Sequence, residues 1–379
     1  MNRKTKIVAT IGPATSSEEM LRELITNGVN VCRLNFSHGS HDDHKHVVET
    51  VRNLDEELGT HTALLADLQG PKLRVGQMEE GTVLEEGATF KLVNREMVGN
   101  GSEAYMNYAQ LPKDVKAGEL ILLDDGKLML EVTSTNNSDE VVTQVKVGGI
   151  LSSNKGVNLP NTAVSLPSLT EKDEEDLKYA LELGVDWVGL SFVRSARDII
   201  ELKHLIKNVH SQARVVAKIE KPQAIADIDD IIAATDAVMV ARGDLGVELP
   251  MEQVPILQKE IVVKCHTNAK PVIIATQMME SMIDNITPTR AEVNDVANSV
   301  MDGADAVMLS GETSVGQYPV QVIRQMSNII KSVEDSPLIE VPQSPPHIRT
   351  KRYITKSICY HAANMANEIN AKAISTLTN

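Results

Sequence analysis

The sequence predicts an α/β protein built on a TIM barrel, in which parallel strands close into a cylinder surrounded by helices. Eight short apolar runs predict the strands, near residues 6–12, 30–36, 62–68, 187–192, 213–219, 237–243, 271–277 and 306–311. Helical patterns separate most of these runs, and such alternation is typical of a parallel sheet. Aromatic residues make up only 3% of the chain. Aliphatic side chains must therefore fill the interior, as they do around buried parallel strands.

A recurring joint marks the places where a helix meets the next strand. Gly28-Val29-Asn30, Gly184-Val185-Asp186 and Gly303-Ala304-Asp305 each precede one of the apolar runs. Glycine suits the position after a helix because it tolerates a positive φ. The predicted helices include the following segments: Glu18–Thr26, Asp43–Leu58, Glu171–Leu183, Ala196–Val209 and Met251–Asn268. We expect the barrel to comprise residues 1–70 and 168–336.

Residues 71–167 interrupt this alternation with short alternating runs and turn signals. Four runs predict antiparallel strands: Phe90–Val93, Leu120–Leu123, Leu128–Leu130 and Val141–Val147. Asp125-Gly126 is a typical hairpin turn. We expect an inserted antiparallel β-barrel domain that hangs on a barrel loop and acts as a lid over the active site.

Residues 337–379 predict part of a third domain of the α/β type. Four prolines break the chain at 337, 342, 345 and 346, and a helical stretch, Lys356–Asn370, and an apolar run, Ala371–Leu377, follow. One helix and one strand do not make a self-sufficient domain. We expect that the chain stops inside this domain, either as a fragment or as a natural truncation.

Charge and cysteine usage exclude several classes of partner. The net charge of −15 argues against a nucleic acid or an acidic membrane surface as a partner, and no apolar stretch is long enough to span a bilayer. Cys32, Cys265 and Cys359 are scattered and odd in number, which argues against a disulfide framework or a zinc site. We therefore expect a cytoplasmic protein with inert buried thiols at Cys32 and Cys265.

Polar residues end nearly every predicted strand, where a TIM barrel carries its active site. They are Thr10, Arg33, Asn35, Asp67, Lys218, Glu220, Asp244, Thr276, Ser310 and Glu312. Lys218 and Glu220 are two residues apart on one strand, so their side chains face the same way. A cation with the carboxylates of Glu220 and Asp244 suits a divalent metal and an anionic substrate.

Structural explanations compete with this interpretation. The two carboxylates could cap helices or pair with Arg242 and Lys221, and Lys218 could pair with Asp67 or Glu220. Hydroxyls such as those of Thr276 and Ser310 often bond only to neighbouring backbone.

Eight ordered motifs resemble those of pyruvate kinases. They are Thr10–Ala14, Arg33–Gly39, Gly70–Arg74, Asn154–Pro160, Lys218–Pro222, Ala241–Gly246, Ala275–Met278 and Met308–Thr313. The resemblance implies transfer of a phosphoryl group from phosphoenolpyruvate to ADP, giving pyruvate and ATP, as the last step of glycolysis. It also implies Mg²⁺ or Mn²⁺ as cofactor and, for a full-length chain, a homotetramer.

The same resemblance implies roles for individual residues. Glu220 and Asp244 would bind the metal, and Lys218 would stabilise the phosphoryl group in transfer. Thr276 would orient a proton donor, and Ser310 would hold a water molecule in that relay. The residues implied to bind phosphoenolpyruvate are Arg33, Lys218, Gly243, Asp244 and Thr276. Those implied to contact the nucleotide are Pro13, Asn35, Ser37, His38, Arg74 and Lys155.

Lys72 departs from the commonest pattern of the family. Many pyruvate kinases carry an acidic residue there and need K⁺ in a pocket resembling Asn35, Ser37, Asp67 and the carbonyl of Leu68. The segment around Lys72 resembles the K⁺-independent branch, in which a fixed ammonium group can replace the mobile ion. We expect that K⁺ is not required; the alternative is that Lys72 is a surface lysine at the lid hinge.

Two other functions remain open at this point. A metal-dependent lyase acting through pyruvate enolate would share the Glu/Asp pair but would not need Lys155 or two arginines for phosphate groups. A regulatory or assembly subunit without turnover is the non-enzymatic alternative.

Overall fold

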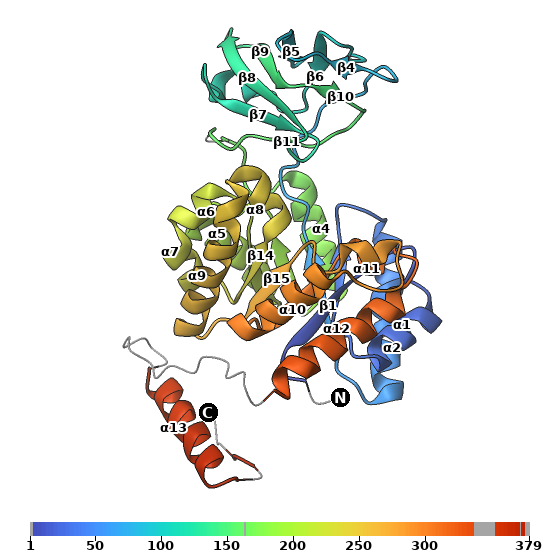
Figure 1. Ribbon diagram of the computed structural model, residues 1–379, viewed down its shortest axis with the longest axis vertical. Coiled ribbons are helices and arrows are strands. Elements are labelled where there is room, and N and C mark those ends of the chain that lie inside the picture. The colour runs from blue at the N-terminus through green and yellow to red at the C-terminus, as the bar shows by residue number, and fades with distance from the viewer. Residues whose placement is uncertain (1–2, 163, 337–352, 372, 376–379) are drawn as a thin grey trace.

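A closed barrel of eight parallel strands forms the centre of the computed structural model (Figure 1). Its order is β1-β16-β15-β14-β13-β12-β3-β2. The strands are β1 (Lys6–Ile11), β2 (Val31–Asn35), β3 (Ala63–Asp67), β12 (Trp187–Leu190), β13 (Arg214–Ile219), β14 (Ala237–Ala241), β15 (Val272–Ala275) and β16 (Ala306–Leu309). The predicted fold class is confirmed. The structure describes residues 3–162, 164–336, 353–371 and 373–375.

Helices surround the barrel and cover its outer face. They are α1 (Glu18–Thr26), α2 (His41–Leu58), α4 (Glu171–Glu182), α5 (Ala196–Asn208), α6 (Pro222–Ala226), α7 (Ile228–Ala234), α9 (Val254–Thr267), α10 (Arg290–Asp302) and α12 (Pro319–Glu334). Short elements follow strand ends: α8 (Arg242–Glu248), η1 (Met251–Gln253), η2 (Glu280–Ile283) and α11 (Gly311–Ser314). Gly28, Gly184 and Gly303 all have the positive φ expected at the joints.

Two helix starts differ from the prediction for local reasons. α2 begins at His41, because Ser40 and Asp43 form a reciprocal capping box. The predicted helix from Met251 begins as the 3₁₀ turn η1, and α9 starts at Val254 with a proline in its first turn.

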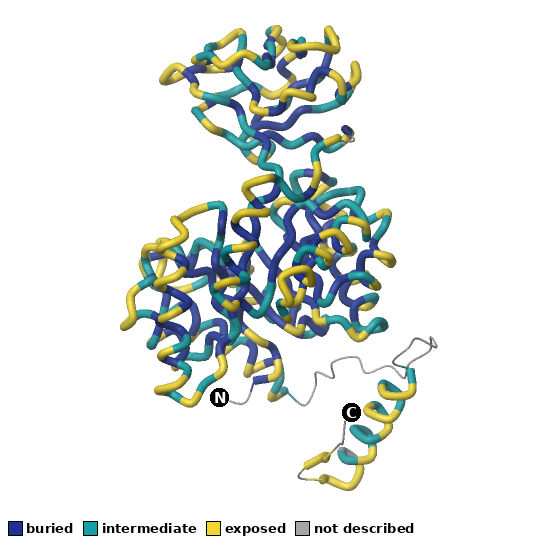
Figure 2. Tube along the Cα trace, turned by 180° about the vertical axis from the view of Figure 1, so that it is seen from behind, coloured by how far each residue is buried: buried dark blue, intermediate teal, exposed yellow. Residues whose placement is uncertain are grey.

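Apolar packing forms two layers in the barrel. The larger core lies between strands and helices, and a smaller cluster fills the interior, with Val8, Leu65, Val216, Met239 and Ile273 among its members. Figure 2 shows the buried strands enclosed by half-exposed helices. The interior is thus a packed core, and ligands have access only at the ends of the strands.

The inserted segment lies beyond the carboxyl ends of the barrel strands (Figure 1). Its elements are β4 (Val83–Leu84), β5 (Thr89–Val93), β6 (Glu103–Tyr105), α3 (Leu111–Asp114), β7 (Leu120–Leu123), β8 (Leu128–Thr135), β9 (Glu140–Val147), β10 (Gly149–Ile150) and β11 (Val157–Asn158). Six strands form one sheet in the order β11-β7-β8-β9-β5-β6 around a separate apolar core. We call this unit the lid.

The lid differs from the expected antiparallel β-barrel in three respects. β5 and β6 run parallel. The described strands form a six-stranded and a two-stranded sheet, and neither of these is closed. The short helix α3, with a proline in its first turn, was not predicted.

After the barrel, α13 (Tyr353–Glu368) begins three residues before the predicted helix. The predicted proline-rich break lies outside the described residues. The predicted final strand is partly outside them too, and residues 373–375 form no strand.

Candidate active site

Lys218 is the centre of a buried charge cluster at the mouth of the barrel. Its ammonium lies 3.0 Å from Oε1 of Glu220 and 3.1 Å from Oδ1 of Asp67, and it donates a 2.7 Å hydrogen bond to Oγ of Ser191. On the other oxygen of Asp67, Arg33 donates from Nε at 2.7 Å. Lys218 and Glu220 therefore share one space, as their spacing predicts. The structural alternative for Lys218, an ion pair with Asp67 or Glu220, is also borne out, since Lys218 pairs with both carboxylates.

Pairing decides which of these buried groups remain charged. Burial alone would raise the pKa of Asp67, but Lys218 and Arg33 outweigh it and hold that pKa below its usual value. Burial would lower the pKa of Lys218, but Asp67 and Glu220 outweigh it and raise that pKa. The pKa of Glu220 is raised by burial, against the effect of Lys218, and the nearby Asp244 raises it further. The mouth thus holds the fixed ammonium of Lys218 and, beside it, the carboxylates of Glu220 and Asp244, which repel each other.

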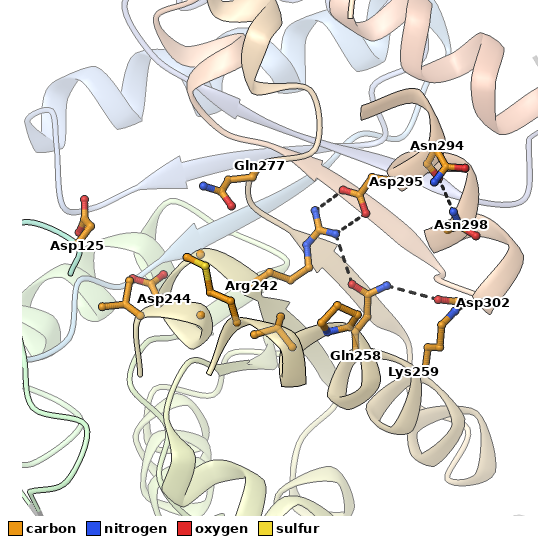
Figure 3. A pocket seen from close by; sticks show the side chains of 16 residues that line it. Asp125, Arg242, Asp244, Gln258, Lys259, Gln277, Asn294, Asp295, Asn298 and Asp302 are labelled. Carbon is orange, nitrogen blue, oxygen red and sulfur yellow. Dashed lines mark hydrogen bonds and ion pairs between the residues drawn. The ribbon is translucent and has the colours of Figure 1, made fainter. Parts of the chain in front are cut away.

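Asp244 faces an open cavity of about 840 Å³ (Figure 3). It lies in the first turn of α8, directly after β14, and is exposed. No hydrogen bond or ion pair of its carboxylate occurs within the described residues. Asp125, from the hairpin turn of the lid, lines the same cavity. Asp244 is therefore available to an incoming ligand.

The donor set fits a hard divalent cation. Glu220 and Asp244 lie close enough for the charge of one to raise the pKa of the other. Within the described residues there is no group of three or more histidine, cysteine, aspartate and glutamate side chains arranged for a metal. Mg²⁺ commonly binds through one or two carboxylates and takes its other ligands from water and substrate. The alternative that Asp244 pairs with Arg242 is wrong, since Arg242 pairs with Asp295.

Thr276 follows β15 in an unusual backbone conformation. Its φ is 70° and that of Gln277 is 52°, which is costly for a β-branched residue and often marks a functional site. Arg242 donates to the Thr276 carbonyl at 2.7 Å. The Thr276 hydroxyl donates to the carbonyl of Ala275 at 2.6 Å and accepts from the N–H of Gly243 at 2.7 Å. The neighbouring loops thus hold this residue in place.

Ser310 follows β16 directly, and its backbone N–H is bound by Glu312. The buried Glu312 carboxylate accepts hydrogen bonds from the N–H groups of Ser310 (2.7 Å) and Met279 (3.1 Å). Burial raises the pKa of Glu312. Glu312 therefore links the loop after β15 to the loop after β16. Its position at a predicted strand end did not indicate this structural role.

The expected nucleotide residues lie in two groups. Pro13 and the loop Asn35–His38 follow β1 and β2, and the N–H of Ser37 donates to Oδ1 of Asn35 at 3.2 Å. Arg74 and Lys155 belong to the lid. Arg74 donates to the Asn154 carbonyl at 3.0 Å, and Lys155 pairs with Asp124 at 2.9 Å. The pKa of His38 is lowered by partial burial and then by Lys72, Arg74 and Arg33. His38 therefore lies where lid and barrel cations meet.

Lys72 lies near the mouth but forms no ion pair with Asp67. Partial burial lowers its pKa, with Arg74 and Lys218 adding to that effect and Asp244 opposing it. Both oxygens of Asp67 face Arg33 and Lys218. In the expected K⁺ pocket, the Leu68 carbonyl accepts a hydrogen bond from Ser191.

Sequence reasoning missed Ser191 as a partner of Lys218. The residue does follow an apolar run, and that position was the available signal. A Cβ at position 243 would lie 3.3 Å from the Thr276 hydroxyl oxygen, so that a side chain there would require Thr276 to shift by a few tenths of an ångström.

Fold and site together define a barrel protein that gathers buried cations and carboxylates at the carboxyl ends of its strands, where barrel enzymes carry their active sites. A family model described as "Pyruvate kinase, barrel domain" matches residues 2–323. The chain belongs to the pyruvate kinase family. Its reaction is the transfer of a phosphoryl group from phosphoenolpyruvate to ADP, which gives pyruvate and ATP in glycolysis.

Named relatives match along the whole chain. A pyruvate kinase of Mycobacterium intracellulare is 48% identical over 384 residues, covering 100% of this chain and 79% of that protein. One of Corynebacterium efficiens is 48% identical over 380 residues with the same coverage. Among solved structures, a pyruvate kinase from Cryptosporidium parvum is similar, with a TM-score of 0.88 at 36% identity, over 98% of this chain and 77% of that one. None of the described helices has the length and apolar character needed to cross a membrane.

Proposed function

We propose that the charge cluster at the barrel mouth carries out the phosphoryl transfer from phosphoenolpyruvate to ADP. The observation that carries this proposal is the position of the Lys218 ammonium between Asp67 and Glu220. Asp244 lies near this cluster, and its carboxylate has no protein partner among the described residues. Phosphoryl transfer depends on positioning and charge neutralisation more than on covalent catalysis. A cation held by two carboxylates meets that requirement without rearranging during the reaction.

Arg33 and Lys218 bind the phosphate of phosphoenolpyruvate. Contacts to Asp67 and to the Thr10 hydroxyl (2.9 Å) fix the guanidinium plane of Arg33. A fixed guanidinium suits phosphate recognition because its donors are already oriented. The bare backbone at Gly243 lets the substrate carboxylate approach closely.

Glu220 and Asp244 would hold Mg²⁺ or Mn²⁺. When bound, the ion neutralises negative charge on substrate oxygens. Lys218, whose ammonium lies beside Glu220, would stabilise the negative charge of the phosphoryl group during transfer.

Thr276 orients the proton that completes pyruvate. Its hydroxyl is already engaged with Ala275 and Gly243, and a hydroxyl is a weak acid, so it positions a donor for the methylene carbon and does not supply the proton alone. Ser310, fixed by Glu312, holds a water molecule in the same relay.

The nucleotide binds between lid and barrel. Lys155 and Arg74 supply charge to its phosphates from the lid, and Pro13, Asn35, Ser37 and His38 contact it from the barrel. The concentration of cations around His38 supports this assignment.

We further propose that the enzyme needs no K⁺, because the ammonium of Lys72 lies near Lys218 and Asp244. A many-fold rise in rate on adding KCl at constant ionic strength would refute this. A cytoplasmic location and a homotetramer are also proposals; light scattering in solution tests the second.

A coupled assay with phosphoenolpyruvate, ADP and Mg²⁺ tests the function directly. We expect turnover by the purified chain and at least about a hundredfold loss in Glu220→Gln. Turnover of Glu220→Gln equal to that of the unmodified chain would contradict the role proposed for the charge cluster.

A further inference from the structure

Three polar residues join the lid to the barrel beside the proposed metal site, and we call them the lid latch. Glu248 ends α8 and is 5% exposed. Its Oε1 accepts a 2.8 Å hydrogen bond from the side-chain amide of Asn158, which lies on β11 of the lid. The same oxygen pairs with the ammonium of Lys221, which lies two residues beyond the end of β13. The latch therefore connects three segments that are distant in sequence.

The two barrel residues of the latch, Glu248 and Lys221, are connected to both proposed metal ligands, Asp244 and Glu220. Asp244 and Glu248 are four residues apart on α8, so they lie on one face of the helix. Lys221 follows Glu220 in sequence, and its ammonium lies 5.4 Å from the ring centre of Phe192. The N–H of Phe192 in turn donates to Oε2 of Glu220 at 2.8 Å. A movement of Glu248 would consequently be transmitted to the carboxylates of both Glu220 and Asp244.

The lid side of the latch leads to the proposed nucleotide residues. Asn158 lies three residues beyond Lys155. It belongs to β11, which is an edge strand of the lid sheet. The pair of Glu248 and Lys221 is nearly dry, with side-chain exposures of 1% and 14%. A hydrogen bond to a buried charge is stronger than one between neutral groups. The Asn158 contact is thus strong enough to favour one lid position.

We propose that the lid latch couples the position of the lid to the geometry of Glu220 and Asp244. Asn158, Glu248 and Lys221 are positioning residues: the latch holds β11 of the lid against α8 and thereby aligns the two carboxylates for transfer. The assignment of the two substrates to this mouth rests on the proposed function, but the mechanical coupling does not.

Asn158→Ala removes the lid contact and leaves the ion pair intact. We expect kcat to fall about tenfold, the factor that corresponds to one hydrogen bond to a charged group. Binding of phosphoenolpyruvate without Mg²⁺ or nucleotide, measured by calorimetry, should stay within about twofold, because the Asn158 side chain contacts Glu248 and neither Arg33 nor Lys218. Asn94→Ala is the matched control, since Asn94 bonds within the lid, to the carbonyls of Ala109 and Ser138.

A charge exchange separates positioning from general damage. Asn158→Asp places a second carboxylate against Glu248 and should lower kcat more than the alanine variant does. Adding Glu248→Gln should restore part of that loss, because the introduced carboxylate would then face an amide and the ammonium of Lys221. A double variant that is no better than Asn158→Asp alone contradicts the proposal.

Spin-label distances between the lid and the barrel test the coupling without turnover. Labels at Glu96 and Glu252, both exposed, should give a broader distance distribution in Asn158→Ala than in the Asn94→Ala control, with Cys359 replaced by serine in both. An unchanged distribution overturns the latch even if the enzyme is active. Absence of turnover in the unmodified chain would overturn the proposed function and leave this distance test decisive for the latch.

Discussion

Replacing Lys218 by methionine removes the ammonium that lies between two buried carboxylates. Methionine is similar in length and keeps the apolar stem, so the change is chiefly one of charge. Asp67 would keep Arg33 as its partner, whereas Glu220 would lose the cation that faces it and keep the N–H of Phe192. Removing one partner of a buried pair typically costs about 3–5 kcal/mol. We expect a loss of unfolding free energy in this range near neutral pH.

The same substitution should change the pH dependence of stability in a defined direction. Glu220 already has a raised pKa, and loss of Lys218 raises it further. A carboxyl group with a higher pKa in the folded than in the unfolded state stabilises the fold at low pH and loses that contribution as pH rises through the folded pKa. The deficit of the variant relative to the unmodified chain should therefore be smaller at about pH 5 than at about pH 7.5.

Activity and stability are measured together against a matched control. Lys203→Met removes a surface lysine, one-third exposed, that pairs with Asp236 at 2.8 Å, and should cost about 1 kcal/mol or less. For Lys218→Met we expect kcat to fall at least about a thousandfold, because the cation facing the transferred group is gone. Urea unfolding and the coupled assay give both values. The reasoning is refuted if Lys218→Met loses no more stability than Lys203→Met, or keeps a tenth of the activity.

Three further predictions follow from single residues. Asp244→Asn should raise the Mg²⁺ concentration for half-maximal rate at least about tenfold. Its melting temperature should not fall, because the carboxylate has no protein partner among the described residues and its charge opposes that of Glu220; equal Mg²⁺ dependence in titrations of both proteins would contradict this. Gly243→Ala should raise KM for phosphoenolpyruvate about tenfold, because the new Cβ would lie 3.3 Å from the Thr276 hydroxyl; an unchanged KM in initial-rate assays would exclude close backbone approach. Burial raises the pKa of Cys32 and Cys265 to about 12. A thiol reagent at neutral pH should therefore modify only the exposed Cys359 rapidly in the folded protein, and all three cysteines after denaturation. Rapid modification of more than one thiol in the folded protein would argue against these buried positions.

The barrel could be predicted because its signals are local. Each strand is an apolar run bounded by glycine and polar residues, and the φ values at Gly28, Gly184 and Gly303 agree with the joints. The period of two along β13 also predicts that Lys218 and Glu220 share one space, and their atoms lie 3.0 Å apart. Such features depend on backbone geometry that neighbouring residues fix.

Contacts between distant segments could not be predicted in this way. Asn158 and Glu248 are 90 residues apart, and Arg242 reaches the carbonyl of Thr276 across 34 residues. Neither contact leaves a periodic pattern, because each depends on how two finished elements pack. The parallel pairing of β5 with β6 is missed for the same reason.

A crystal structure of the chain with Mn²⁺ and phosphoenolpyruvate tests the central claim most directly, since anomalous scattering locates the metal independently of the protein atoms. We predict one manganese ion bound by the carboxylates of Glu220 and Asp244, with the phosphate of the substrate on Lys218 and Arg33. Manganese bound elsewhere, or a phosphate remote from Lys218, would contradict it.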